Sequence, residues 1–195
     1  HNKTLYISNY KLEELDSKSN QLKPLVASNS GRQILSVLSL NDSIMLLGKM
    51  EDIFTYNTNS NVLKLVKNYM TKPISPNMVY HFFKRFDGTI WAASETGLFL
   101  LNKQGDIIDC YGENANAKNV LPVSNFTDVF EDAKGMVWVT TNGYGLYKWD
   151  RKKNTAIRFG IEDGLPTNAI YSILEDNEKK LWMGSENGLI DRKST

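Results

Sequence analysis

Cysteine and histidine are scarce in this sequence. Among its 195 residues there is 1 cysteine, Cys110, and there are 2 histidines, His1 and His81. A single cysteine excludes an internal disulfide, a zinc ribbon and a redox pair of the CxxC type. So few thiols and imidazoles also leave no ligand set for a zinc site. We therefore expect neither a metal nor a cofactor, and we expect Cys110 to be a small buried strand residue.

Long apolar runs and an excess of one charge are missing as well. No apolar run approaches the 18 residues that indicate a membrane-spanning helix, so we expect no membrane contact by this segment. The 23 Lys and Arg residues nearly balance the 22 Asp and Glu residues, and no long block of like charge occurs, which argues against a nucleic-acid partner. The sequence begins at His1 without a Met or a signal peptide, so we expect a piece of a longer protein.

The sequence contains a repeat. Three segments share an apolar strand, a turn, a Trp and a Gly-Leu pair, and their tryptophans, Trp91, Trp138 and Trp182, lie 47 and 44 residues apart. A fourth copy has Leu46 in the Trp position, 45 residues before Trp91. A fragment around Leu5 lies 41 residues before Leu46. A period of this length is typical of a β-propeller, in which each repeat forms one four-stranded blade.

Each copy has the composition of short strands joined by tight turns, because Val, Ile, Phe, Tyr, Thr and Trp dominate its segments. In the Trp91 copy we expect strands at 79–85, 89–94, 97–102 and 106–112. The first turn carries residues that supply the positive φ of tight hairpins: Asp87-Gly88, Lys134-Gly135 and Asn41-Asp42. In the last copy Lys179 stands in the place of the glycine, so that turn should be of another type or mildly strained.

These observations predict an all-β fold, a β-propeller segment of four-stranded antiparallel blades that forms an incomplete arc of a larger propeller. We place the blades at about 1–32 (partial), 33–77, 78–125, 126–168 and 169–195 (partial). Such an arc would start in the second strand of one blade and stop after the third strand of another. The faces of its end blades would then need cover from further blades of the parent protein or from another copy.

Two interpretations exist for the recurring tryptophans. An exposed Trp often marks a carbohydrate site, but a Trp at one place in every blade favours packing between blades. We therefore assign the following residues to the blade core: Leu46, Trp91, Trp138 and Trp182, with Gly97, Gly145 and Gly188 at the start of the third strand. The inner strands at 79–83 and 170–174 should be buried on both faces by neighbouring blades.

The last copy resembles a known repeat. Its segments 164–176 (GLPTNAIYSILED), 181–185 (LWMGS) and 187–189 (NGL) are similar to the two-component regulator propeller repeat, which builds the extracytoplasmic sensor of bacterial hybrid two-component systems. The resemblance covers residues 33–192 closely and 1–32 loosely. The Trp138 copy departs from the pattern by one inserted residue, and the Leu46 copy lacks both the Trp and the Gly-Leu pair.

The resemblance implies a ligand-sensing module in the periplasmic region of an inner-membrane histidine kinase. In that family the propeller units precede an immunoglobulin-like linker, one membrane helix, a kinase and a response regulator. Its ligands tend to be oligosaccharides, and its sensors work as dimers. The resemblance thus implies an oligosaccharide ligand, control of glycan-utilisation genes, a homodimer, and contact with the remaining propeller blades and kinase of the same chain. This segment would then be no enzyme, although its parent would be a histidine kinase.

Propeller ligands usually bind at one mouth of the central channel, where loops entering the innermost strands meet loops joining the second and third strands. In this sequence those loops carry polar and charged residues that suit hydroxyl-rich or anionic sugars. The candidate ligand-binding residues are Arg32, Lys49, Asn77, Glu95, Asn125, Asn142, Tyr144, Asn168, Glu186 and Asn187. A turn role is the alternative for the recurring asparagines, since Asn forms Asx turns and tolerates the left-handed conformation.

The expected inner strands carry one more set of polar residues. His81 stands where the other copies have Ser36, Asp128 and Ser172, and we interpret these positions as packing or hydration of a narrow tunnel. No triad, P-loop, GxGxxG or HExxH pattern occurs, so the sequence indicates no catalytic residue.

Two other functions remain as alternatives to ligand sensing. A propeller can serve as a scaffold for protein docking or dimerisation. It can also be a polysaccharide lyase or hydrolase, which here would require Glu95, Glu186 and Asp128 to converge with a base.

Overall fold

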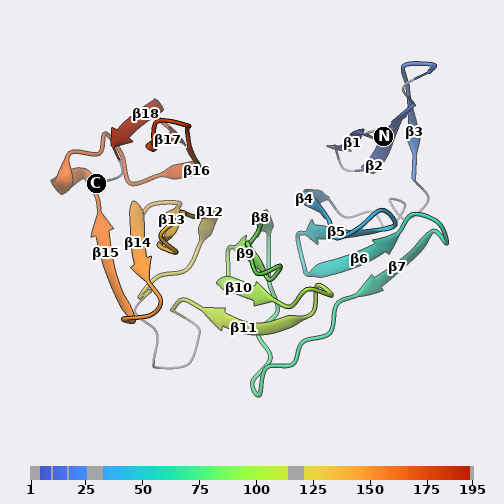
Figure 1. Ribbon diagram of the computed structural model, residues 1–195, viewed down its shortest axis with the longest axis horizontal. Helices are drawn as coiled ribbons and strands as arrows, with labels where there is room; N and C mark the ends of the chain where they lie inside the picture. The colour runs from blue at the N-terminus through green and yellow to red at the C-terminus, as the bar shows by residue number, and fades with distance from the viewer. Residues whose placement is uncertain (1–4, 10, 17, 26–32, 114–120, 194–195) are drawn as a thin grey trace.

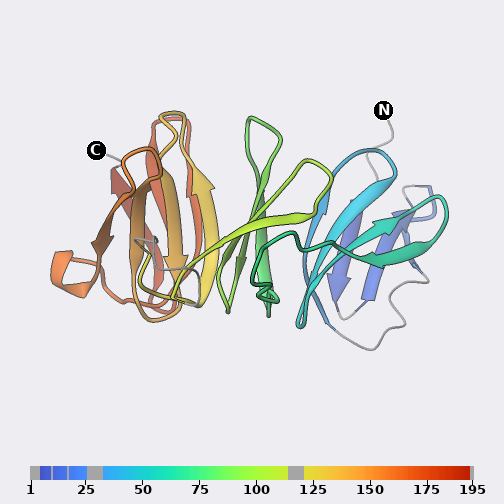
Figure 2. The same cartoon turned by 90° about the horizontal axis from the view of Figure 1, so that it is seen from below.

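The structure is a computed structural model that describes all residues except 1–4, 10, 17, 26–32, 114–120 and 194–195. The described part forms five antiparallel sheets that follow one another along an open arc (Figure 1). Seen from a direction turned by 90°, the sheets stand side by side with their strands running across the thickness of the arc (Figure 2). The fold is therefore a β-propeller segment that does not close, as the sequence predicts.

In each of the five sheets every pair of neighbouring strands is consecutive in the chain, so each sheet is a simple meander. The first sheet comprises β1 (Leu5–Asn9), β2 (Lys11–Asp16) and β3 (Gln21–Pro24). The second comprises β4 (Ile34–Ser39), β5 (Ile44–Lys49), β6 (Ile53–Asn57) and β7 (Val62–Leu65). The third comprises β8 (Val79–Lys84), β9 (Ile90–Ser94), β10 (Leu98–Leu101) and β11 (Ile107–Tyr111). The fourth comprises β12 (Phe126–Glu131), β13 (Val137–Thr141), β14 (Leu146–Asp150) and β15 (Thr155–Phe159). The fifth comprises β16 (Ile170–Glu175), β17 (Lys180–Ser185) and β18 (Gly188–Lys193).

The strands expected in the Trp91 copy are confirmed to within one residue at each end by β8, β9, β10 and β11. Strands β4, β8, β12 and β16 lie along the inner edge of the arc (Figure 1). Strand β1 packs beside β4 in the way that β5 packs beside β8 and β9 beside β12. It therefore holds the place of a second strand, and no innermost strand of the first sheet lies among the described residues.

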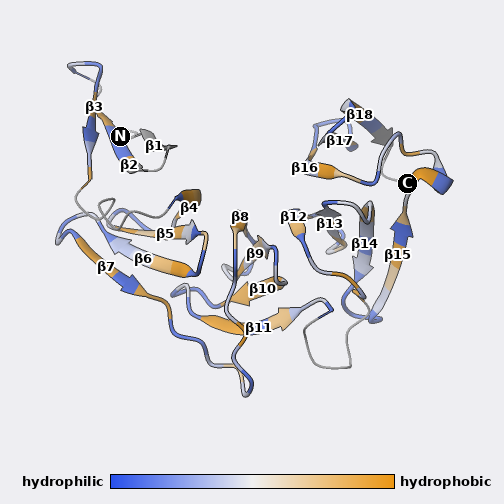
Figure 3. Ribbon diagram, turned by 180° about the vertical axis from the view of Figure 1, so that it is seen from behind, coloured by the Kyte–Doolittle hydropathy of each residue, from blue (hydrophilic) through white to orange (hydrophobic). Residues whose placement is uncertain are grey.

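The apolar core lies between consecutive sheets. Trp91 packs with Val129 of the following sheet, Leu46 packs with Phe82, and Trp138 packs with Ile173. Hydrophobic colour accordingly gathers in β8, β10 and β12, whereas the outer strand β3 is largely hydrophilic (Figure 3). Each sheet is thus stabilised mainly by burial against its neighbours, at roughly 25 cal/mol for each Å² of apolar surface removed from water.

The tryptophans share this arrangement until the last sheet. Trp91 is 0% exposed and Trp138 is 3% exposed. Trp182 is only half-buried, because no described sheet follows β16–β18. The Leu of the Gly-Leu pair behaves likewise: Leu98 and Leu146 are 0% exposed, whereas Leu189 is 71% exposed.

The expectation that inner strands are buried on both faces is wrong. The strands buried at every position are second and third strands, β9, β10 and β13. Inner strand β8 is only partly buried, and β16 leaves Leu174 57% exposed. The reason is geometric, since an inner strand has a sheet neighbour on one side only and its other edge faces the axis of the arc.

The first turns are built in three ways. Gly88 and Gly135 adopt φ of +84° and +78°, as predicted. Lys179 adopts φ of +64°, a conformation that strains a residue with a Cβ. The positive φ expected at Asn41-Asp42 is absent: Asn41 instead accepts two hydrogen bonds on its side-chain oxygen, from the N–H groups of Ser43 and Ile44. An Asx turn therefore replaces the left-handed turn there.

The helical part of the described chain is one short 3-10 turn, η2 (Ile161–Asp163), between β15 and β16. Within the described ranges, no helix combines the length and the apolar character that crossing a membrane requires.

Candidate functional site

Loops from several sheets meet at one end of the strands, where the channel mouth is expected. The N–H of Glu95 donates to the carbonyl of Asn77 at 2.9 Å, and the N–H of Asn125 donates to the carbonyl of Glu95 at 2.7 Å. The N–H of Asn142 then donates to the carbonyl of Asn125 at 3.1 Å. This run of backbone hydrogen bonds crosses from the third sheet to the fourth, and it brings four of the candidate ligand-binding residues together.

The three recurring asparagines differ in what they do. Asn77 donates from Nδ2 to Oε2 of Glu95 at 2.6 Å, so the two candidate side chains bind each other. Asn125 has a φ of +60°, which fits the turn interpretation, and its buried Oδ1 has no hydrogen-bond partner in the described structure. Asn168 accepts the N–H of Ile161 on Oδ1 at 3.1 Å and the N–H of Gly145 on its carbonyl at 2.8 Å.

The candidates in the later loops are the most exposed. Asn142, Glu186 and Asn187 are exposed, and Tyr144 is 47% exposed. Glu186 accepts a hydrogen bond from the Thr167 hydroxyl at 2.6 Å. Asn187 donates to the carbonyl of Pro166 at 3.1 Å. These contacts orient side chains that still face the solvent.

One described candidate, Lys49, does not reach the surface that these loops form. Lys49 was expected to face a ligand, but it is only 3% exposed, and its ammonium lies 5.3 Å from the centre of the Phe54 ring. Lys49 is buried at the end of β5, a strand that contacts β8 of the following sheet, so its charge is not offered to the mouth. Arg32 lies outside the described residues.

The polar residues of the inner strands link neighbouring sheets. A register shift precedes each of them, between Ile34 and Ser36 in the second sheet and at the equivalent step in the next three sheets. Ser36 donates to the carbonyl of Val79 at 2.7 Å. His81 contacts Oδ1 of Asp128 through Nδ1, and Oδ2 of Asp128 accepts the N–H of Ile173 at 2.9 Å.

These links fit the packing interpretation for Ser36, His81 and Asp128, since each side chain reaches the next inner strand. For Ser172 the structure shows close packing instead, because a Cβ added at Gly184 would lie 2.6 Å from its Oγ. A β-bulge turns a side chain away from its regular direction, which explains how one position in each sheet can point at the neighbouring sheet.

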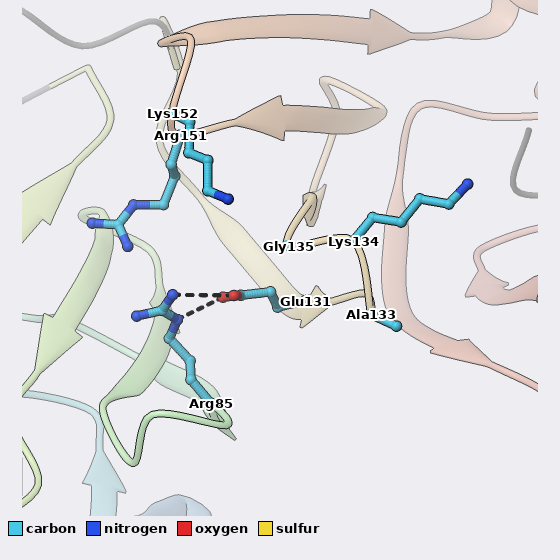
Figure 4. A pocket seen from close by; sticks show the side chains of 7 residues that line it. All are labelled: Arg85, Glu131, Ala133, Lys134, Gly135, Arg151 and Lys152. Carbon is cyan, nitrogen blue, oxygen red and sulfur yellow. Dashed lines mark hydrogen bonds and ion pairs between the residues drawn. The ribbon is translucent and has the colours of Figure 1, made fainter.

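The opposite end of the sheets carries a pocket that the sequence did not indicate. It has a volume of about 520 Å³ and lies between the third and fourth sheets (Figure 4). Its lining residues are Arg85, Glu131, Ala133, Lys134, Gly135, Arg151 and Lys152. In Figure 4 Arg151 and Lys152 project from the β14–β15 hairpin on one side of the paired Arg85 and Glu131, whereas Lys134 points away.

The floor of this pocket is a charge-paired cluster. Arg85 donates from Nε to Oε2 of Glu131 at 2.6 Å and from Nη2 to Oε1 at 3.1 Å. Its Nη1 donates to Asp87 and to Thr89, each at 2.8 Å. The hydrogen bonds from Arg85 to Glu131 raise the pKa of the guanidinium further, and the Thr89 hydroxyl holds the pKa of Asp87 below its usual range.

Arg151 forms the wall of the pocket above aromatic rings. Its guanidinium carbon lies 4.8 Å from the ring centre of Trp91, 5.5 Å from that of Tyr111 and 5.7 Å from that of Trp149. Its Nη2 donates to the Tyr111 hydroxyl at 3.0 Å, and that hydroxyl donates to Asp109 at 2.7 Å. Burial and the neighbouring Asp109 raise the pKa of Tyr111, so the phenol stays protonated at neutral pH.

A departure from the repeat marks this pocket in the sequence. The residue six places before the Trp is Asp132 in the fourth sheet and Asp176 in the fifth, and it is Arg85 in the third. A comparison of the copies for exchanges of charge would therefore have found the site.

The structure brings no catalytic set together at the three carboxylates considered for an enzyme. Glu95 is bonded to Asn77, Glu186 to Thr167, and Asp128 to His81 and Ile173, so each carboxylate has its own separate partners. Within the described ranges, no group of three His, Cys, Asp or Glu side chains has the proximity to hold a metal ion.

Comparison with known proteins agrees with this fold. The two component regulator propeller family matches residues 164–187. The chain is 26% identical over 200 residues to histidine kinase P4 of Formosa agariphila, which corresponds to 95% of this chain and 14% of that protein.

Two solved structures from B. thetaiotaomicron are also similar. One is the extracellular domain of a putative one component system, with a TM-score of 0.76 and 17% identity over 97% of this chain and 26% of that one. The other is the extracellular domain of a putative hybrid two component system, with a TM-score of 0.73 and 19% identity over 96% of this chain and 25% of that one. The chain thus spans about a quarter or less of each of these proteins. It is a β-propeller segment that carries the two-component regulator propeller repeat.

Proposed function

We propose that this chain is part of the ligand-sensing propeller of a hybrid two-component sensor kinase and that it lies in the periplasm. The match of residues 164–187 to the two component regulator propeller family carries this proposal. It is supported by the similarity to a histidine kinase and to the extracellular domains of two signalling systems. The segment itself binds and does not catalyse, and the kinase of the parent protein supplies the chemistry.

The ligand that we propose is an oligosaccharide. The loops at the channel mouth offer amide, carboxylate and phenol groups, as in Asn142, Tyr144, Glu186 and Asn187, and such groups recognise the hydroxyl groups of sugars. Binding across loops of different sheets would favour one arrangement of the sensor over another, and this bias would pass to the kinase. A homodimer of the full sensor and control of glycan-utilisation genes belong to the same proposal.

Calorimetry on the full-length protein tests the proposal. We expect at least one class among glycosaminoglycan, mucin and plant oligosaccharides to bind and to change the rate of kinase autophosphorylation in membrane vesicles. Tyr144→Phe and Asn142→Ala should weaken that binding, whereas Lys72→Gln, an exposed change in the loop before β8, should leave it unchanged. The proposal is contradicted if no oligosaccharide of the three classes binds in calorimetry and none changes the rate of autophosphorylation.

Docking is a second candidate function, because the last sheet exposes an apolar face. Tyr171 is 48% exposed, Leu174 57% and Leu189 71%. A scaffold role is favoured if sugars never bind to the full-length protein and a partner chain protects this face.

A further inference from the structure

The junction between the third and fourth sheets has lost a carboxylate and gained a cation. Asp132 and Asp176 each accept the indole N–H of their own sheet, from Trp138 at 3.2 Å and from Trp182 at 2.7 Å. Arg85 occupies the equivalent place in the third sheet. Exchange of an aspartate for an arginine shifts the local charge by two units, so this junction is electrostatically unlike the one that follows it.

The charge of Arg85 is compensated inside the cluster. Both oxygens of Glu131 accept hydrogen bonds from Arg85, and Oε2 also accepts the Trp91 indole N–H at 3.1 Å. Arg85 has a second carboxylate partner in Asp87 at 2.8 Å. Because all of these groups are engaged, they form a floor and leave ligand contacts to the other cations.

Arg151 and Lys152 supply those contacts. Within the residues that the structure describes, neither side chain has a carboxylate partner, although both line the pocket (Figure 4). Arg151 is held by the aromatic rings beneath it and by the Tyr111 hydroxyl, so a ligand would not have to order it. A guanidinium held in this way presents its remaining N–H groups as a fork that matches the oxygens of a carboxylate or a sulfate.

The pocket has room for more than a free ion. Its volume of about 520 Å³ falls within the range of roughly 300–1,000 Å³ that is usual for small-molecule sites. Four of its seven lining residues are cationic and one is anionic, whereas the chain as a whole has a net charge of only +1. Concentration of positive charge in one concave place attracts anions and disfavours cations.

We propose that this pocket binds the anionic group, a carboxylate or a sulfate ester, of an acidic saccharide, with Arg151 and Lys152 as its direct ligands. The Arg85–Glu131 pair positions the two sheets that form the site. This inference rests on the proposed function, since it names the charge class of the sensed oligosaccharide, and it adds a binding site at the end of the propeller opposite the channel mouth.

The test uses calorimetry on the full-length protein with four probes: a chondroitin 4-sulfate tetrasaccharide, trigalacturonate, neutral chitotetraose and sodium sulfate. We expect one of the two acidic saccharides to bind, chitotetraose not to compete with it, and sodium sulfate to bind at least tenfold more weakly. Arg151→Gln combined with Lys152→Gln should weaken binding of the acidic saccharide at least tenfold. Lys152→Gln alone, which removes an exposed charge without disturbing the aromatic rings beneath Arg151, should weaken binding of the acidic saccharide about threefold.

Lys153→Gln is the matched control, because it removes the same charge from the same hairpin. Its side chain is 78% exposed and lies 3.6 Å from Asp150, and it does not line the pocket. Its binding should equal that of the unmodified protein. Unfolding temperature, measured for every variant, identifies any loss that comes from misfolding, and Lys152→Gln then decides the matter.

Several results overturn the inference. One is that neither acidic saccharide binds. Another is that an acidic saccharide binds the Lys152→Gln and Lys153→Gln proteins equally well. A third is that sodium sulfate binds as tightly as the acidic saccharide, which would mean that the sugar contributes nothing. Oligosaccharide binding that persists in the double variant overturns this site and leaves the proposed function standing. If no sugar binds the full-length protein or changes the rate of kinase autophosphorylation, the proposed function itself is overturned.

Discussion

The indole Nε1 of Trp91 donates its hydrogen bond to Glu131 of the next sheet, at 3.1 Å. In the two later copies the indole bonds to an aspartate of its own sheet. Glu131 also forms an ion pair with Arg85, and the side chains are only 17% exposed for Glu131 and 16% for Arg85. One carboxylate therefore joins the third and fourth sheets by neutralising a cation and satisfying a buried indole.

Replacement of that carboxylate should loosen the junction. We expect Glu131→Gln to lower the free energy of unfolding by about 2 kcal/mol, because hydrogen bonds to a charged partner are lost in a partly buried place. Urea unfolding of this chain measures the change. Glu162→Gln is the control, since Glu162 is 58% exposed and its pair with Arg158 lies at the surface, where an ion pair contributes roughly 0–1 kcal/mol. Equal effects of the two substitutions would contradict the assignment.

Two glycines in one loop separate steric collision from backbone strain. A Cβ at Gly145 would collide with the Phe159 carbonyl oxygen, and the φ of +86° adds strain. Gly143 has a φ of +105° but nothing within 4 Å. We expect Gly145→Ala to cost about 3 kcal/mol or more and Gly143→Ala about 1–2 kcal/mol, measured by thermal and urea unfolding. A larger loss at Gly143 would rule out the packing described here.

The recurring tryptophans should differ in their contribution to stability. Trp138 is buried against the following sheet, whereas Trp182 is half-buried. We expect Trp138→Ala to cost about 3–5 kcal/mol of the free energy of unfolding. Trp182→Ala should cost about half as much, because a half-buried indole has less buried apolar surface to lose. Urea unfolding followed by circular dichroism measures both. The inter-sheet role of Trp138 is wrong if its replacement costs no more than that of Trp182.

The thiol of Cys110 should be inert in the folded chain. It is 7% exposed, and burial raises its pKa to about 12. Only the thiolate is a nucleophile, so we expect no reaction with iodoacetamide at pH 8, and rapid reaction after unfolding in urea. Because the folded pKa is raised, the folded state holds its proton longer than the unfolded one. The contribution of this thiol to the free energy of unfolding is therefore complete below the ordinary thiol pKa of 9.0. It is lost as the pH rises from there toward 12. Fast labelling of the native chain would contradict the burial of this strand.

The exposed face of the last sheet should be covered in the working protein. Leu189 is 71% exposed, but Leu98 and Leu146, at the same place in earlier sheets, are completely buried by the sheet that follows. We expect a cysteine introduced as Leu189→Cys to react quickly with a maleimide in this chain. In the full-length protein it should react at least tenfold more slowly, because another sheet or a second copy lies on it. Tyr69→Cys, at a 59% exposed loop position, is the control and should react equally in both. Equal rates at Leu189 would show a face that stays open.

The Trp and Gly-Leu spacing predicted three of the copies, and the apolar segments around Leu46 and Leu5 extended the repeat to an open arc of five units. This information is local, because a strand and its hairpin depend on residue types that alternate or turn within a few positions. The same spacing identified Trp91 and Trp138 as candidates for packing between sheets. It did not reveal that the second strand, rather than the inner one, is the most buried, since burial depends on which sheets lie alongside.

The candidate site was predictable only in part. The sequence identified the loops that Asn77, Glu95, Asn125 and Asn142 share, because loop order follows from the meander. Whether a side chain reaches solvent depends on its neighbours, and Lys49 is buried for that reason.

Residue types and their period alone determined that this chain folds into successive antiparallel sheets of three or four described strands. Contacts between units, 40 to 46 residues apart in the sequence, were decided by the tertiary structure, including Trp91 with Glu131, Arg85 with Glu131 and Arg151 with Tyr111. The physical reason is that a strand forms from short-range preferences, whereas a pocket forms where two sheets meet. The angle and register of that meeting are set by the packing of the whole arc.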